Sequence, residues 1–175
     1  LNLIQQTLIK KEEAIIDIGG SDSLLVDHLL EMGYSNISIF DISVKALERA
    51  KLRLGGQSET IDWITVDIRL FKPSKQYSLW HDRAAFHFLT DKEDITHYVE
   101  TAGKLTKPSG HLIISTFSMH TPQKKCSGLD ITQYSENSIK KTFQNDFNHI
   151  RSFEEIHTTP FNTKQSFLFN LFERK

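Results

Sequence analysis

The 175-residue sequence has little of several features that would assign it to common protein classes. Its single cysteine, Cys126, excludes a disulfide within the chain, and no Cys and His spacing resembles a zinc site, so we expect no metal. Its apolar runs are far shorter than the roughly 20 residues of a membrane span. Residues 1–11 lack the basic start and apolar stretch of a secretory signal. These absences predict a reduced, cytoplasmic protein with no membrane partner.

The charges are also nearly balanced. The chain has 21 Lys+Arg and 22 Asp+Glu, for a net charge of −1, which argues against nucleic acid as a partner because phosphate recognition usually needs a basic surplus. Apolar residues make up 38% of the chain, enough for a core, and the length suits one domain. We therefore expect a single domain over residues 1–175.

Strand and helix patterns alternate along the first two thirds of the chain. Short apolar runs that suit buried strands cover 14–18, 37–41, 61–66, 77–80 and 111–117, and helical patterns cover 25–33, 43–56 and 91–106. This alternation predicts an α/β fold with parallel strands. A loop over 118–133, a helix over 135–145 and an antiparallel hairpin of 150–157 with 166–173 are expected to follow.

The first strand runs directly into Gly19-Gly20-Ser21. Ligands of open α/β sheets gather beyond the carboxyl ends of the strands, and glycines there let the backbone approach a ligand closely. A tight turn with no ligand is an equally good interpretation of this pair of glycines taken alone.

Two acidic residues change that balance. Asp41 ends the second strand, where a carboxylate can accept both hydroxyls of an adenosine ribose, and Asp67 follows the third strand. Capping of the next helix is the competing interpretation for both residues. Because several strands end near an acid at one sheet edge, we favour ligand binding.

The segments Asp17-Ile18-Gly19-Gly20-Ser21, Trp80-His81-Asp82 and Lys107-Pro108-Ser109-Gly110, together with Asp41 and Asp67, resemble the class I S-adenosylmethionine-dependent methyltransferases. The resemblance runs from about Ala14 to the C-terminal hairpin. More narrowly, residues 80–89 (WHDRAAFHFL) look like a segment of bacterial members related to eukaryotic protein-lysine methyltransferases. It implies a Rossmann-like doubly wound sheet of seven strands in the order 3-2-1-4-5-7-6, with an antiparallel last strand.

The resemblance also implies S-adenosylmethionine as the cofactor and a role for each matching residue. Asp17 would lie near the methionine amino group, and backbone around His81 would face the methionine part. Asp41 would bind the ribose, and Asp67 the adenine amino group. The implied cofactor-binding residues are Asp17, Gly19, Gly20, Ser21, Asp41, Ile42, Asp67, Ile68 and His81. Ser21 departs from the family pattern, since it replaces a glycine and its Cβ narrows the space for the cofactor.

The implied reaction is an in-line methyl transfer to an acceptor, either a protein lysine or a small molecule. Asp82, just past the fourth strand, is a predicted catalytic residue, because a carboxylate can orient an amine and take its proton. His81 is the second predicted catalytic residue. Arg83 could form a structural ion pair with Asp82 or another acid, or hold a carboxylate of the acceptor. The acceptor is expected to enter at the loop over 118–133.

Other interpretations stay open. His87 suits a core histidine, and Cys126 an ordinary loop thiol. A metal site built from His81, Asp82 and His87 matches no standard ligand pattern. A nicotinamide dehydrogenase would need later glycines that the turn lacks. A methyltransferase-like binding module without turnover is the rival from another class. Residues 1–13 read as an amphipathic N-terminal helix, and the start at Leu1 leaves open that residues precede it.

Overall fold

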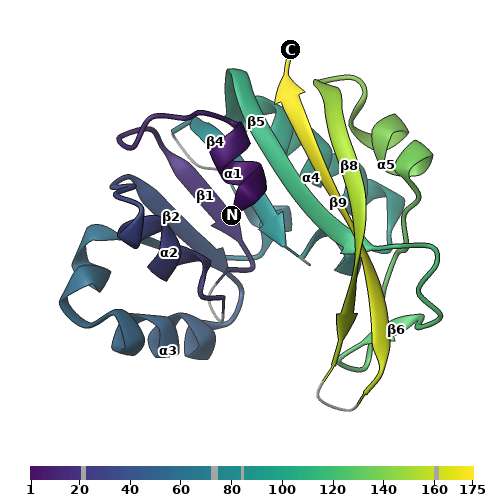
Figure 1. Ribbon diagram of the computed structural model, residues 1–175, viewed down its shortest axis with the longest axis horizontal. Helices are drawn as coiled ribbons and strands as arrows, with labels where there is room; N and C mark the ends of the chain where they lie inside the picture. The colour runs from purple at the N-terminus through teal and green to yellow at the C-terminus, as the bar shows by residue number, and fades with distance from the viewer. Residues whose placement is uncertain (21–22, 72–74, 84, 160–161) are drawn as a thin grey trace.

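The computed structural model describes residues 1–20, 23–71, 75–83, 85–159 and 162–175. It is organised around a seven-stranded sheet in the order β3-β2-β1-β4-β5-β9-β8 (Figure 1). Neighbouring strands are parallel from β3 to β5, and β9 pairs antiparallel with both β5 and β8. The predicted fold and strand order are confirmed. The strands are β1 Ile15–Ile18, β2 Ile37–Asp41, β3 Asp62–Thr65, β4 Tyr77–Arg83, β5 Thr106–Phe117, β8 Phe147–Thr158 and β9 Lys164–Arg174.

Several helices begin at a residue whose side chain caps them. The Ser43 side chain accepts a hydrogen bond from the backbone N–H of Ala46, and the Asp91 side chain accepts one from that of Glu93. Both caps satisfy N–H groups that would otherwise lack an intrahelical partner. The helices are α1 Asn2–Gln6, α2 Leu25–Glu31, α3 Val44–Leu54, α4 Lys92–Leu105 and α5 Glu136–Phe143, with short 3₁₀ helices η1 Gly55–Thr60, η2 Ile68–Leu70 and η3 Phe86–Phe88.

Three segments differ from the sequence prediction. The helix expected over residues 1–13 is only the five-residue α1, because Leu8 adopts a φ of +55° that no helix continues. Strand β5 begins at Thr106 rather than at His111, and so it includes Pro108. The loop over 118–133 contains a small hairpin of β6 Lys125–Cys126 and β7 Leu129–Asp130.

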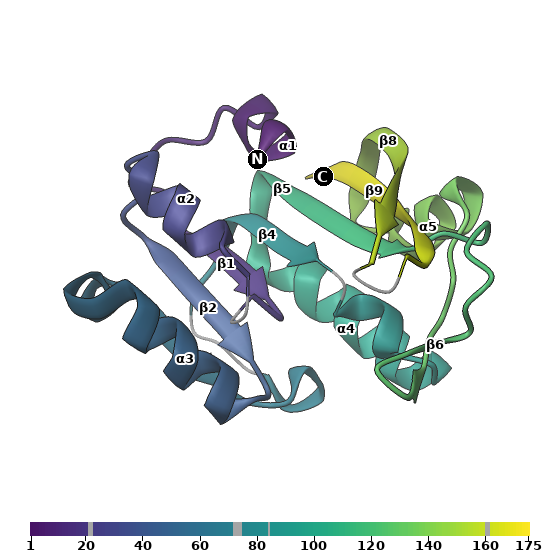
Figure 2. The same cartoon turned by 60° about the horizontal axis from the view of Figure 1, so that its bottom comes forward.

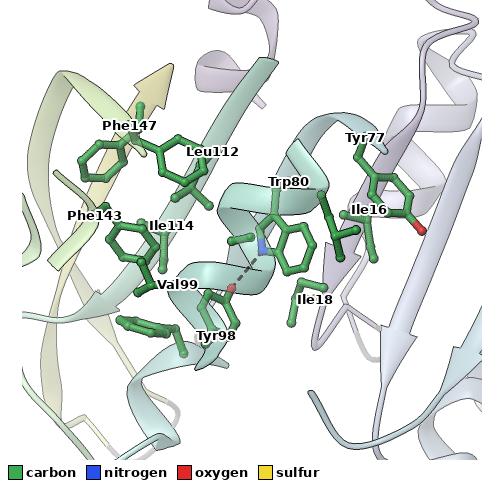
Figure 3. Close-up of a cluster of buried hydrophobic side chains, with 14 of the residues drawn as sticks. Ile16, Ile18, Tyr77, Trp80, Tyr98, Val99, Leu112, Ile114, Phe143 and Phe147 are labelled. Atoms are coloured by element: carbon green, nitrogen blue, oxygen red, sulfur yellow. Dashed lines mark hydrogen bonds between the residues drawn. The ribbon is translucent and has the colours of Figure 1, made fainter. Parts of the chain in front are cut away.

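Two apolar layers cover the two faces of the sheet (Figure 2). On one face, α4 and α5 pack against Trp80 and its neighbours, as Figure 3 shows for Tyr98, Val99 and Phe143. On the other face, α1, α2 and α3 pack on Ile15, and this layer continues to Leu79. Because side chains alternate along a strand, the parity of a position in β1 or β4 decides which layer it enters. In the described part of the chain, no helix is both long and apolar enough to cross a membrane.

Candidate functional site

A cleft of about 600 Å³ opens where β1, β2 and β3 end. We call it the main cleft. Ligands of doubly wound sheets bind at this edge, beyond the carboxyl ends of the strands. Its walls come from the turn after β1, the ends of β2 and β3, the η3 segment and α4. Their residues include Gly19, Asp41, Ile42, Asp67, Ile68, Arg69, Ala85, Phe86 and Tyr98.

The turn after β1 depends on its two glycines. Gly19 has a φ of +72°, and a Cβ there would lie 2.9 Å from the Cβ of Ala85. A Cβ on Gly20 would lie only 2.0 Å from Asp17 Oδ2. The glycines therefore allow this backbone to pass against neighbouring groups at the edge of the main cleft. Ser21, the third predicted member of the turn, lies outside the described residues.

The two predicted acids of the outer strands both line the main cleft. Asp41 ends β2, and its Oδ1 accepts a hydrogen bond of 2.8 Å from the Ser43 N–H. The next residue, Ile42, is 67% exposed and offers an apolar surface at the rim. The structure thus brings Asp41 and Asp67 to one cavity, together with Ile42 and Ile68.

Asp67 has a partner that the sequence reasoning missed. Arg69 Nε lies 2.9 Å and 3.0 Å from the two carboxylate oxygens, and the Arg69 backbone N–H also donates to Oδ1. These hydrogen bonds hold the pKa of Asp67 below its usual value. Arg69 also lines the main cleft. The signal was available, because an Asp two residues before an Arg at a helix start can pair with it locally.

The side chains of Asp17 and His81 lie on the face of the sheet that α1, α2 and α3 cover. Asp17 Oδ1 lies 2.6 Å from His81 Nδ1, and both side chains are nearly buried. The second oxygen, Asp17 Oδ2, is buried and has no hydrogen-bond partner among the described residues. A buried acceptor without a donor is costly, so this oxygen is suited to a ligand donor at the turn. His81 does not line the main cleft in this structure, and its side chain positions Asp17 instead.

Asp82 lies on the opposite face of β4 from His81 and is fully buried. It accepts hydrogen bonds from Tyr98 Oη at 2.6 Å, from the Ala85 N–H at 2.9 Å and from the Phe86 N–H at 3.1 Å. Burial raises the pKa of Asp82 to about 6, against the lowering effect of these bonds. In this structure the carboxylate of Asp82 is enclosed by the protein's own donors and does not line the main cleft.

His87 lies in the core, as its apolar neighbours in sequence suggested. Its ring lies 4.8 Å from that of Phe117, and neither ring nitrogen has a hydrogen-bond partner in the described structure. Burial lowers the pKa of His87 to about 4. His81 contacts Asp17, Asp82 contacts Tyr98, and His87 packs against Phe117. The three side chains therefore do not come together as the metal site considered above.

Two further cavities adjoin the turn on the side of the β8–β9 hairpin. The inner cavity, of about 450 Å³, is lined by Asp17, Gly20, Arg83, His157, Gln165 and Phe167. The outer cavity, of about 320 Å³, shares Ser23, Leu24 and Arg83 with it and adds residues that include His28, His81, Glu155 and Phe169. Gly19 lines both the main cleft and the inner cavity, so the two spaces meet at the turn after β1.

Comparison with known proteins agrees with this geometry. A family model described as "Methyltransferase domain" matches residues 16–114, which include the turn and every predicted site residue. Malonyl-[acyl-carrier protein] O-methyltransferase 2 of Ilyobacter polytropus is 28% identical over 108 residues, which are 61% of this chain and 40% of that protein. The chain spans about two fifths of the length of the curated relatives that it matches.

Solved structures share the fold at low sequence identity. The N-methyltransferase NodS of Bradyrhizobium japonicum, in complex with S-adenosyl-L-homocysteine, superposes with a TM-score of 0.73 at 15% identity, over 99% of this chain and 84% of that one. An S-adenosylmethionine-dependent methyltransferase from Mesorhizobium loti gives a TM-score of 0.79 at 16% identity, over 99% and 96%. At these identities the likeness establishes the architecture.

Proposed function

Because the chain belongs to the methyltransferase domain family, we propose that it transfers a methyl group from S-adenosylmethionine to an acceptor. The cofactor would lie in the main cleft with its methionine end against Asp17 and Gly20, and the acceptor would occupy the Arg83 side of the adjoining inner cavity. The observation that carries this proposal is the placement of Asp41 and Asp67 in one cleft that begins at the Gly19–Gly20 turn. Acids at the ends of successive parallel strands, beyond a glycine turn, suit an adenosine group.

The residues of the turn fit the methionine end of this cofactor. The buried, unpartnered Asp17 Oδ2 can accept a hydrogen bond from an ammonium group, and Gly20 leaves room for the approach. Asp41 would accept from the ribose hydroxyls and Ile42 would pack on adenine. Asp67, fixed by Arg69, would accept from the adenine amino group through lone pairs that the guanidinium leaves free.

When bound, S-adenosylmethionine supplies a methyl group on a positively charged sulfur. The chain's own residues bind and orient the reactants, since positioning supplies much of the acceleration of an in-line displacement. Asp17 would be fixed by His81. Asp82 would act as a positioning residue, because its bonds hold Tyr98 and the backbone of residues 85 and 86, all of which belong to the cleft wall.

The acceptor is proposed at the level of a class. The narrower resemblance of residues 80–89 suggests a protein lysine, whereas the curated relatives named above are O-methyltransferases of a malonyl-carrier protein. A small or carrier-linked acceptor fits better, because the inner and outer cavities measure only about 450 and 320 Å³. We also propose a reduced, cytoplasmic location, to which the single cysteine is suited.

Calorimetric titration of S-adenosylmethionine and S-adenosylhomocysteine into the purified chain tests the donor site, with NAD as the control ligand. We expect micromolar binding of both sulfur compounds and none of NAD. If a folded sample binds neither sulfur compound, the proposed activity is wrong, and the rival interpretation of a methyltransferase-like binding module replaces it.

A further inference from the structure

We propose that Arg83 is a carboxylate-binding residue, and that the methyl acceptor is an organic acid whose carboxylate it holds between the inner and outer cavities. This inference rests on the proposed methyl transfer and names the acceptor class for it. The sequence left two alternatives for Arg83, a structural ion pair or a hold on an acceptor, and the structure distinguishes them.

The structural ion pair with Asp82 is excluded by the strand geometry. Successive side chains of β4 point to opposite faces, so Arg83 lies on the face of His81 while Asp82 points into the layer under α4. The oxygens of Asp82 are taken by Tyr98 and by backbone donors. Arg83 is exposed and has no ion-pair or hydrogen-bond partner within the described residues.

The surroundings of Arg83 favour an anion. Asp17 Oδ1 is paired with His81, and Asp17 Oδ2 is the oxygen that we assign to the ammonium group of the cofactor. Glu155, on the outer cavity, forms no ion pair with Arg83 in the described structure. His157 and Gln165 lie directly opposite each other on β8 and β9 and line the inner cavity beside Arg83. An imidazole and a side-chain amide can each donate a hydrogen bond, so three donor groups meet at this cavity.

A guanidinium is also the side chain best matched to a carboxylate. Its planar fork of N–H groups donates two parallel hydrogen bonds to the two oxygens, which gives both strength and orientation. Among the other residues of the two cavities, Leu24, Phe167 and Phe169 provide apolar surface that suits a short carbon chain. A carboxylic acid on a short carbon chain or a thioester matches this combination of a guanidinium, neighbouring donors and apolar surface.

The position of Arg83 also suits the chemistry. The inner cavity shares Gly19 with the main cleft, and its Asp17 and Gly20 are assigned to the methionine end of the cofactor. An acid held by Arg83 on the other side of this cavity would therefore lie next to the bound cofactor. In transfer to a carboxylate, an oxygen forms the new bond to the methyl carbon, the carbon–sulfur bond breaks, and its electron pair stays on the neutral thioether. A carboxylate acceptor loses no proton in this reaction, so the transfer needs no general base and does not require an exposed Asp82.

The test compares each acid with its own methyl ester. Malonyl, succinyl and glutaryl thioesters of N-acetylcysteamine, and the methyl ester of each, are titrated into the full chain with and without saturating S-adenosylhomocysteine. We expect the wild-type chain to bind at least one acid more than tenfold tighter than its ester. Arg83→Gln should bring that ratio below about twofold, and Arg83→Lys should give an intermediate ratio because an ammonium cannot form the fork.

Arg151→Gln is the matched control. Arg151 lies on the neighbouring surface of β8, where it packs over the Phe153 ring outside both cavities. The substitution removes the same charge as Arg83→Gln, and this variant should keep the acid preference. Circular dichroism and thermal unfolding check that each variant is folded, which we expect because Arg83 is exposed.

Three results would overturn the inference. One is an absence of acid preference in the wild-type chain for all three pairs, and another is a preference that survives Arg83→Gln. The third is a more than tenfold loss of S-adenosylhomocysteine affinity in Arg83→Gln with the acid preference intact, which would assign Arg83 to the cofactor carboxylate. Failure of S-adenosylhomocysteine to bind at all would instead refute the proposed function, and the titrations without it would still test Arg83.

Discussion

The acids near the ends of the inner strands β1 and β4 have surroundings opposite to those of the acids that follow the outer strands β2 and β3. Asp17 and Asp82 are buried and held by the protein's own groups, whereas Asp41 and Asp67 line the main cleft. Asp17 and Asp82 each lie one residue before the end of a strand, within the sheet, whereas Asp41 is the last residue of β2 and Asp67 follows β3. The same residue type is therefore enclosed by the fold near the centre of the sheet and open to the main cleft toward one edge.

The largest expected effect is on Asp82. Asp82→Ala would leave Tyr98 Oη and two backbone N–H groups buried without an acceptor, at about 1–3 kcal/mol for each group. We expect a loss of at least about 3 kcal/mol in the free energy of unfolding, measured by urea denaturation. Asp41→Ala, the matched change at an outer strand, should cost less than about 1 kcal/mol. Equal losses in the two variants would refute the distinction between inner and outer acids.

Binding should show the reverse order. Asp41→Ala removes the carboxylate that we assign to the ribose, and hydrogen bonds to a charged group contribute about 1.5–3 kcal/mol. We expect a loss of ten- to a hundredfold in S-adenosylhomocysteine affinity by calorimetry, with the unfolding midpoint nearly unchanged. Asp41→Asn is the companion variant, since it keeps the shape of the side chain. Wild-type affinity in both would remove Asp41 from the site.

Acid should affect the buried core through His87 and Asp82 with opposite signs. His87 has a pKa of about 4 in the folded chain, below its unfolded value, so its neutral form stabilises the fold and that stability is lost as pH falls from about 6.5 to 4. Asp82 has a raised pKa of about 6, so its protonation in the fold adds stability over the range from about pH 6 to 4.

His87→Phe separates the two contributions. Between pH 7 and pH 5, the difference in unfolding free energy between variant and wild type should shift by about 2 kcal/mol in favour of the variant. Urea denaturation at the two pH values measures it, and a constant packing cost of the larger ring cancels in the comparison. A difference that does not change with pH would mean that His87 does not titrate as a buried group.

The smallest effect is expected at Arg69. Its ion pair with Asp67 is exposed, and such pairs contribute about 0–1 kcal/mol. Arg69→Ala should hardly change stability and should weaken S-adenosylhomocysteine two- to fivefold, because Asp67 loses its fixed orientation. Lys75→Ala is the control, since it removes an exposed pair with Asp62 away from the main cleft. A hundredfold loss in Arg69→Ala would instead indicate direct contact with the ligand.

Much of the architecture could be predicted from the sequence because its signals are local. The alternation of apolar runs and helical patterns predicted the elements, and Ser43 and Asp91, where two of the predicted helices start, cap them in the structure. The N-terminal helix was overestimated, because the backbone of Leu8 departs from the helical region in a way that the amphipathic pattern does not reveal.

The candidate site was predictable in part, and the division follows the range of the interactions. The Gly19–Gly20 turn and the acids after β2 and β3 follow from position along single strands. The partners of Asp17 and Asp82 did not follow, because His81 and Tyr98 come from elements 64 and 16 residues away in the chain. No pattern within β4 itself could indicate which donors would enclose Asp82.

The sequence by itself determined that parallel strands end in glycines and acids at one edge of a sheet, since strand periodicity and turn chemistry are encoded locally. Only the tertiary structure decided which of these acids face a cleft and which are buried. It also decided that the side chain of Arg83 points away from that of Asp82 and lines a cavity with His157 and Gln165 of the β8–β9 hairpin. The physical reason is that burial and partners depend on the packing of elements far apart in the chain, and these two factors determine whether a charged group is structural or available to a ligand.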